Sequence, residues 1–76
     1  MKRLLEILEE IQPGIDYANC EDLIDGHYFD SLDILSLVAE LEEEFDIVIP
    51  TVEVIPENFN SAARLWAMIQ RLHEEG

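Results

Sequence analysis

Ser31 is the residue of this sequence whose surroundings most clearly suggest chemistry. A carboxylate stands on each side of it in the run Asp30-Ser31-Leu32-Asp33, and His27 lies four residues before it. Ser31 as nucleophile and His27 as base would suit a hydrolase, but a hydrolase also needs an orienting group, an oxyanion hole and a substrate cleft. A chain of 76 residues has little interior in which to form such a cleft. The sequence therefore argues against a self-contained hydrolase and leaves another role for Ser31 open.

A calcium loop is the second kind of site that the sequence suggests, at Asp22-Leu23-Ile24-Asp25-Gly26. If Gly26 takes the sixth position of an EF-hand loop, Leu23 and Leu32 take the third and twelfth positions, and neither side chain can bind calcium. Cys20 is the only cysteine, so the chain has no intrachain disulfide and no thiolate-rich metal site. We therefore expect no specific metal site, and divalent cations would gather on the acidic surface only as counterions.

The sequence is strongly acidic, with 18 Asp and Glu residues against 4 Lys and Arg residues and a formal net charge of −14. Phosphate backbones repel such a surface, which argues against nucleic-acid binding, and anionic membranes repel it in the same way. The chain shows neither a secretory signal nor an apolar run long enough to span a membrane. We therefore expect a cytoplasmic monomer that does not insert into membranes.

A helix that we expect over residues 30–45 places Ser31 at its first turn. Asp30 is a good N-cap, because its carboxylate can accept the free amide hydrogens of that turn. Apolar residues recur at helical spacing and predict the buried face: Ile34, Leu37, Val38, Leu41 and Phe45. Four acidic residues point away from this face: Asp33, Glu40, Glu43 and Glu44. Three further apolar residues lie at its margin: Leu32, Leu35 and Ala39.

The acidic side of this helix lacks the basic neighbours that surface helices usually have. No Lys or Arg occurs between Leu4 and Ala63, so we expect its carboxylates to have no local partner. Opposite charges at i,i+4 stabilise a helix, whereas like charges repel. The face is therefore either simply solvated or kept for a basic partner, whose complementary potential would speed encounter and set the register.

The remaining segments predict two further helices and a long first loop. Residues 2–12 form a helix that Pro13-Gly14 ends, and Ser61 caps a last helix from Ala62 to about His73. Residues 15–29 form an ordered loop, 47–50 an extended connector without a second strand to pair with, and 57–60 a short turn after a proline. The chain is thus expected to be one all-α domain over residues 1–76, a small bundle of three main helices plus one short helical turn. The apolar residues expected to pack inward from these segments are Leu4, Ile7, Leu8, Ile11, Ile15, Leu23, Ile24, Tyr28, Phe29, Phe59, Ala62, Leu65, Trp66, Ile69 and Leu72.

Three stretches together resemble the acyl carrier protein family: Asp30-Ser31-Leu32-Asp33, Leu41-Glu42-Glu43-Glu44-Phe45-Asp46 and Ile49-Pro50. The resemblance covers nearly the whole chain in length, helix order and loop placement. A fourth stretch, Pro56-Glu57-Asn58-Phe59-Asn60-Ser61, is similar to the aromatic-Asn-Thr type turn of D-alanyl carrier proteins.

The chain departs from these families at two places. Leu32 stands where D-alanyl carrier proteins usually have Phe. Both groups commonly have a glycine two or three residues before the motif Asp, and here Tyr28 and His27 occupy those positions, with Gly26 one residue earlier. The second departure therefore concerns the conformation of the loop just before the motif.

The resemblance implies that a separate phosphopantetheinyl transferase attaches 4'-phosphopantetheine to Ser31. The free amide hydrogens and the dipole of a helix N-terminus favour an anion such as the resulting phosphodiester. The thiol of the arm would carry an acyl or aminoacyl group as a thioester between partner enzymes, at high effective concentration. The carrier itself would catalyse nothing. The partner-binding residues implied are Asp30, Leu32, Asp33, Glu40 and Glu43.

The sequence leaves the cargo open. Fatty-acid or polyketide intermediates, D-alanine for cell-wall polymers and another aminoacyl group all remain, and the stretch after Pro56 favours an aminoacyl cargo slightly. An unmodified acidic interaction module is the alternative to a carrier.

Overall fold

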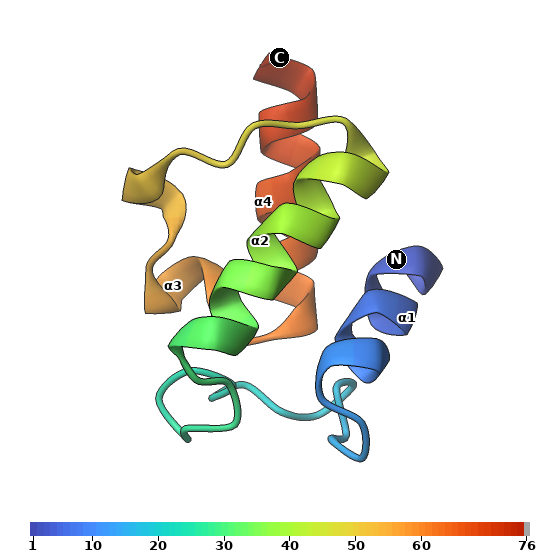
Figure 1. The fold of residues 1–76 in the computed structure, drawn as a ribbon, viewed down its shortest axis with the longest axis vertical. Coiled ribbons are helices and arrows are strands. Elements are labelled where there is room, and N and C mark those ends of the chain that lie inside the picture. The colour runs from blue at the N-terminus through green and yellow to red at the C-terminus, as the bar shows by residue number, and fades with distance from the viewer. Residues whose placement is uncertain (76) are drawn as a thin grey trace.

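The computed structural model describes residues 1–75, which form helices joined by turns and loops (Figure 1). The elements are α1 Lys2–Ile11, α2 Ser31–Phe45, the 3-10 helix η1 Thr51–Glu53, α3 Pro56–Phe59 and α4 Ala62–Glu75. No strand occurs within this described range, so the all-α prediction is confirmed. The helix boundaries lie within one or two residues of those expected. Residues 47–50 form neither helix nor strand, and the 3-10 helix η1, which was not expected, follows them.

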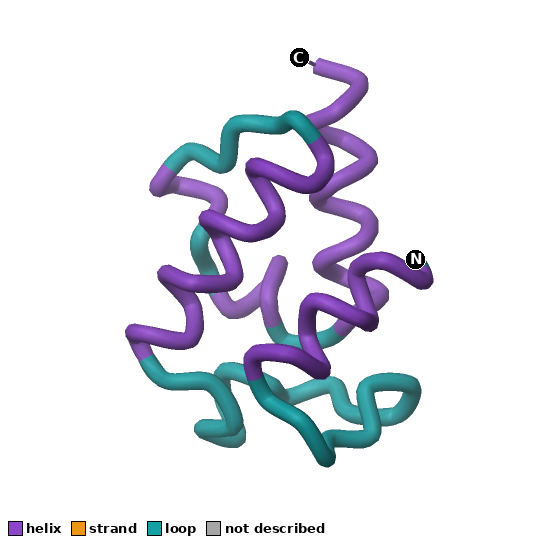
Figure 2. The backbone as a smooth tube through the Cα atoms, turned by 45° about the vertical axis from the view of Figure 1, so that its right-hand side comes forward, coloured by secondary structure: helices purple, strands orange, loops and turns teal. Residues whose placement is uncertain are grey.

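The helices α1, α2 and α4 pack against one another, and α3 packs against α4. Figure 1 shows α1 running toward the end of the molecule where the long loop lies, and α2 returning from that end. Figure 2 shows the long loop joining the C-terminal end of α1 to the N-terminal end of α2, while the connector after α2 crosses the opposite end. Ser31 therefore lies where the loop, α1 and α2 meet.

The core draws apolar residues from all four α-helices, the long loop and the connector: Leu4, Ile7, Leu8, Tyr17, Leu23, Phe29, Leu37, Leu41, Ile47, Ile49, Phe59, Ala62, Leu65, Met68, Ile69 and Leu72. The expected inner faces of α1 and α4 are largely confirmed, with Ile11 and Trp66 partly buried. Met68 is also buried, although it was not expected to be. It lies three residues after Leu65 and four before Leu72, so it shares their helical face.

The buried face of α2 is narrower than its apolar pattern indicated. Leu37 and Leu41 are buried, whereas Ile34, Val38 and Phe45 are half-buried at the edge of the core. Beyond that edge, Leu32 and Leu35 are 73% and 66% exposed. Since α2 packs on α1 to one side and on α4 to the other, only its central stripe is enclosed.

The long loop is ordered, and Leu23 and Phe29 are buried in it as predicted. The expectation that Tyr28 also packs inward is wrong, because its side chain is 47% exposed. Tyr17 of the same loop is buried instead, and its ring contacts Phe29 edge-on with 6.5 Å between centroids.

Asn60 fastens this loop to the junction of α3 and α4. Its side-chain oxygen accepts hydrogen bonds from the backbone amides of Ile24 (3.0 Å) and Asp25 (3.1 Å), and its side-chain nitrogen donates to the Asp25 carboxylate (3.0 Å). Its backbone carbonyl accepts the Leu23 amide. The Leu23 carbonyl in turn accepts the amides of residues 28 and 29. This series of hydrogen bonds therefore connects Asn60 to the residue that precedes Asp30.

The glycine before the motif lies one residue earlier than is common in these families, and the structure shows what Gly26 and the adjacent His27 each do. Gly26 is required by close approach, since a Cβ there would lie 2.7 Å from the Asp22 carbonyl oxygen. His27 has φ 61, in the left-handed region that glycine adopts without strain. Histidine is among the side chains that adopt this region more often than most. The loop thus makes its left-handed turn with His27, three residues before Asp30.

The connector after α2 is held by a carboxylate of α2. Asp46 ends the helix in a left-handed conformation, with φ 52. The Glu42 side chain then accepts the backbone amide of Ile49 at 2.8 Å, and Ile47 and Ile49 are buried. At the same end of α2, Phe45 contacts Trp66 edge-on, with 5.8 Å between ring centroids.

Ion pairs tie the N- and C-terminal helices to the middle of the chain. Arg3 of α1 pairs with Glu44 at 2.9 Å, so Glu44 has a partner that is distant in the sequence, although it has no local one. The pairing crosses between helices, which sequence spacing does not show.

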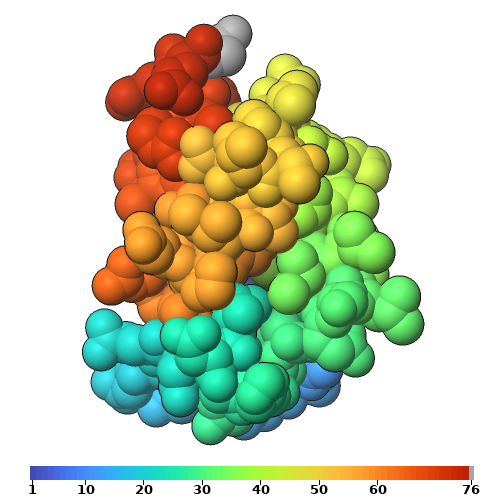
Figure 3. All heavy atoms as spheres, turned by 90° about the vertical axis from the view of Figure 1, so that its left-hand side faces the viewer, coloured from blue at the N-terminus to red at the C-terminus, as the bar shows by residue number. Residues whose placement is uncertain are grey.

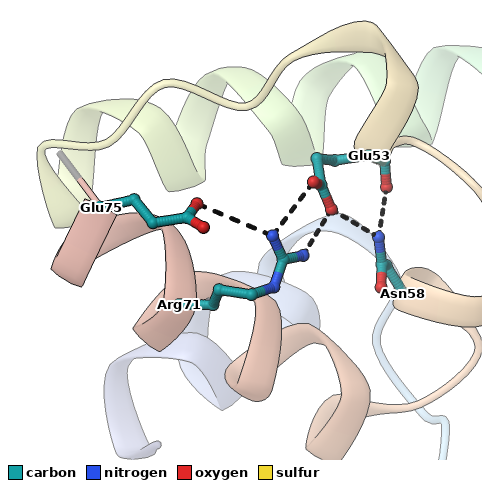
Figure 4. A network of polar contacts seen from close by, with 4 residues as sticks. All are labelled: Glu53, Asn58, Arg71 and Glu75. Carbon is teal, nitrogen blue, oxygen red and sulfur yellow. Dashed lines mark hydrogen bonds and ion pairs between the residues drawn. The ribbon is translucent and has the colours of Figure 1, made fainter.

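Figure 4 shows the second ionic network, in which Arg71 of α4 donates to both carboxylate oxygens of Glu53 in η1. Glu53 also accepts from Asn58, and Arg71 lies 3.8 Å from Glu75. The hydrogen bond from Arg71 lowers the pKa of Glu53. The tie is therefore fully formed above the ordinary pKa of glutamate and is lost as the pH falls through the lowered value.

We expect His27→Gly to leave the free energy of unfolding unchanged or to raise it by up to about 1.5 kcal/mol. The substitution removes left-handed strain of about 1–2 kcal/mol, against an entropy cost for glycine of roughly 0.5–1 kcal/mol. His27→Val should lower that free energy by about 1–2 kcal/mol, because a β-branched side chain is poorly tolerated at positive φ. Urea titrations followed by circular dichroism measure both.

A His73→Val substitution in the exposed last turns of α4 is the matched control, with an expected effect within about 0.5 kcal/mol. Equal urea midpoints for the His27→Gly and His27→Val variants would contradict the assignment of strain to this position.

Candidate functional site

Ser31 is the first residue of α2 and is exposed to solvent. Asp30 precedes it as the N-cap in an extended conformation, with φ −93 and ψ −177, as predicted. The Asp30 carboxylate accepts the backbone amide of Asp33 at 2.8 Å, and the Asp33 carboxylate accepts the amide of Asp30 at 3.3 Å. In this reciprocal capping box, the two carboxylates on either side of the serine accept free backbone amides at the start of the helix. Ser31 is exposed, and the side-chain cap of the helix comes from Asp30 rather than from its hydroxyl.

Asp33 has a further partner from another helix. Gln12, at the C-terminal end of α1, donates its side-chain amide to the Asp33 carboxylate at 2.8 Å. Asp33 is accordingly half-buried, whereas Asp30 is exposed. The structure therefore separates the two carboxylates of the motif, which looked equivalent in the sequence.

The other acidic residues of α2 also differ in what they do. Glu42 holds the connector through Ile49, and Glu44 pairs with Arg3. Glu40 and Glu43 are exposed, and neither forms an ion pair within residues 1–75. These two carboxylates are the acidic groups of α2 that can reach a partner without breaking an internal contact.

Exposed apolar side chains lie beside Ser31. Leu32 and Leu35 belong to the first turns of α2, and Tyr28 ends the loop that leads to them. Figure 3 shows this loop (teal) and the start of α2 (green) on one face of the molecule. A face that combines exposed leucines with carboxylates lacking cations suits a partner with apolar and basic groups.

A small apolar cavity lies on the inner side of α2, one helical turn after Ser31. Its lining comes from the loop, α2 and the segment around α3: Ile24, Ile34, Val54, Ile55, Pro56 and Phe59. Its volume is about 50 Å³. This is larger than the roughly 30 Å³ that one liquid water occupies but well below the 150 Å³ of a cavity known to hold benzene.

Ser31 and His27, the pair considered for a hydrolase, are both exposed to solvent. A cavity of about 520 Å³ lies between the start of α1, loop residues 17–21 and residues 61–63, and its lining includes neither of them. Among the described residues, no group of three or more His, Cys, Asp or Glu side chains is placed to hold a metal ion. None of the described helices combines the length and apolar composition needed to cross a bilayer.

Searches against known proteins find curated relatives over most of the chain. A D-alanyl carrier protein of Streptococcus suis (strain 05ZYH33) is 33% identical over 70 residues, which cover 91% of this chain and 89% of the relative. The D-alanyl carrier protein of Streptococcus sanguinis (strain SK36) is 33% identical over 63 residues, covering 82% and 80%. That of Streptococcus mutans serotype c is 32% identical over 70 residues, covering 91% and 89%.

No protein-family model matches the chain, and no solved structure matches it significantly. The relative from Streptococcus suis aligns with 91% of this chain, and the helical bundle agrees with an acyl-carrier-like protein. The chain therefore belongs to the D-alanyl carrier protein family.

Proposed function

We propose that this protein carries its cargo on a 4'-phosphopantetheine arm attached to Ser31. The observation that supports the proposal is the exposed Ser31 hydroxyl at the first position of a capped α2. The hydroxyl oxygen would attack the pyrophosphate of coenzyme A in the active site of a separate transferase. A phosphodiester forms on Ser31, the bisphosphorylated adenosine leaves, and the serine proton passes to the transferase. The carrier supplies position and contributes no catalytic group.

The start of α2 suits the modified product as well as the reaction. The N-terminus of a helix favours a phosphate through its unpaired amides and its dipole. Solvent exposure of Ser31 and Leu32 lets a transferase enclose the hydroxyl without unfolding the helix. The arm then extends into solvent, and its thiol forms a thioester with the cargo.

We expect Ser31→Ala to abolish modification while leaving the helical circular dichroism spectrum nearly intact, because Asp30 rather than Ser31 caps α2. Incubation with a broad-specificity phosphopantetheinyl transferase, coenzyme A and magnesium, followed by intact-mass measurement, tests this. Ser36→Ala is the matched control, since Ser36 is also exposed on α2. A wild-type chain that gains no mass would favour the unmodified interaction module, and a Ser31→Ala chain that gains mass would move the site elsewhere.

Docking is the second part of the proposal, and we assign it to Leu32, Glu40 and Glu43. The support comes from their exposure on α2 and from the absence of an internal ion pair on the two glutamates within residues 1–75. Both the transferase and the loading and transfer enzymes would present basic groups to this face. Complementary potential of this kind mainly increases the rate of association.

Glu43→Lys should raise the KM of the transferase for the carrier by roughly threefold to tenfold at low salt, because a rim charge that attracted the partner now repels it. Added salt should shrink the difference by screening. Glu9→Lys changes the net charge by the same amount at an exposed position of α1, and it should raise the KM less. Equal KM values for the two variants at low salt would contradict docking through α2.

D-alanine is the cargo that we propose. Three relatives are D-alanyl carrier proteins by name, and the cavity behind Ile34 has only about 50 Å³. A fatty chain would fill more than that, so α2 would have to move away from the α3 segment to enclose it. A D-alanyl group has one methyl side chain and a charged amine, and it needs no such enclosure.

Methyl NMR spectra of Ile24, Ile34 and Val54 test this assignment. We expect D-alanyl and unloaded forms of the modified protein to give the same shifts, because the cargo stays outside. An octanoyl form should give equally small changes if the cavity stays closed. Large shifts confined to these three residues in the octanoyl form would show that the chain enters the core, and would favour an acyl cargo.

A further inference from the structure

Two contacts connect the end of α1 and the loop that follows it to residues on either side of Ser31. The polar contact is the hydrogen bond of 2.8 Å from the side chain of Gln12 to Asp33. The apolar contact is the edge-on packing of Tyr17 with Phe29, the residue before Asp30. Residues 12 and 33 are distant in the sequence, so this connection depends on the folded arrangement of α1 and α2.

Gln12 is itself fixed in place by its backbone. Its amide donates to the Leu8 carbonyl at 2.8 Å, and its carbonyl accepts the Tyr17 hydroxyl at 2.6 Å. That hydroxyl also lies 3.0 Å from the Leu8 carbonyl oxygen, so it satisfies carbonyls at the end of α1. Burial raises the pKa of Tyr17 to about 12, which keeps the hydroxyl protonated as a donor. Gln12 therefore presents its side chain from a rigid position.

The acceptor of this hydrogen bond is an oxygen that also closes the capping box. Oδ2 of Asp33 accepts from Gln12 and from the amide of Asp30. Loss of the Gln12 bond would leave Asp33 free to turn toward solvent, and the turn that contains Ser31 would be held by the Asp30 side of the box alone. The position of Ser31 thus depends on a residue of another helix.

We infer that Gln12 is a positioning residue for phosphopantetheine transfer and that Asp33 serves this reaction through its hydrogen bonds rather than as a charge read by the partner. This inference rests on the proposed modification of Ser31. It differs from the docking role assigned to Glu40 and Glu43, which form no ion pair within residues 1–75. A charge role and a hydrogen-bond role respond differently to salt and to an amide substitution.

Transferase kinetics at low and high salt separate the two roles. Gln12→Ala should raise the KM for the carrier by roughly threefold to tenfold, the value of one hydrogen bond, because a smaller fraction of molecules presents Ser31 correctly. The increase should be equal at both salt concentrations, since no exposed charge is changed. Gln70→Ala, on the exposed side of α4, is the matched control and should be neutral.

Two substitutions of Asp33 complete the test. Asp33→Asn removes the charge but keeps an oxygen that can accept both hydrogen bonds, so its KM should stay within about twofold of wild type. Asp33→Ala should be impaired at least as much as Gln12→Ala, and adding Gln12→Ala to it should cost nothing more, because the shared contact is already gone. Thermal melts confirm that each variant is folded at the assay temperature.

Amide hydrogen exchange at Asp30 and Asp33 reads the same contact without any transferase, and it should accelerate in Gln12→Ala but not in Gln70→Ala. A wild-type chain that is never modified would refute the proposed function while exchange still tests the contact. Wild-type KM and unchanged exchange in Gln12→Ala would overturn the inference. A salt-sensitive loss in Asp33→Asn would overturn it in favour of docking by charge.

Discussion

Mutual repulsion among carboxylates is the constraint that every element of this protein has to accommodate, because 18 acidic residues face 4 basic ones. A folded chain brings these charges together, and the cost grows as the chain becomes compact. Apolar packing from both ends of the chain opposes that cost. The structure also reduces the cost locally, because several carboxylates accept hydrogen bonds from backbone amides and so need no cation.

Backbone amides act as the counterparts of acidic side chains at both ends of α2. Asp30 and Asp33 satisfy each other's amides at the start of the helix, and Glu42 accepts the amide of Ile49 after its end. A helix N-terminus is electropositive, so carboxylates are stabilised at the first of these places. The scarce basic side chains are used where helices must be joined, as with Arg3 and Arg71. Glu40 and Glu43 are left for the surface.

The sequence predicts the helices of this protein well, but it predicts contacts between residues distant in the sequence poorly. Periodicity locates α1, α2 and α4, and Asp30 marks the start of α2, because these signals lie within a few residues of one another. The bonds from Gln12 to Asp33 and from Arg3 to Glu44 join distant positions, and no local pattern identifies them. Composition indicated unpartnered acids on α2, yet folding supplies partners for some of them.

The loop before the motif shows the same limit for a different reason. Turn preferences point to a glycine where the chain turns left-handed, but this chain uses His27, and Gly26 meets a steric requirement instead. Asn60 fixes the loop from the junction of α3 and α4, which the resemblance of its stretch to a known turn did not reveal. Tyr28 and Phe29 both looked suited to the core, and the folded loop buries only Phe29.

The contact between Phe45 and Trp66 has a practical consequence, because Trp66 is the only tryptophan of the chain. Phe45 ends α2 and Ser31 begins it, and a helix rises about 1.5 Å per residue, so roughly 20 Å of helix separate the serine from Phe45, which the indole contacts. The emission of this indole therefore responds to the packing of α2 on α4 and is remote from events at the serine. The protein therefore contains an intrinsic optical probe of its folded state at the end of α2 that is far from Ser31.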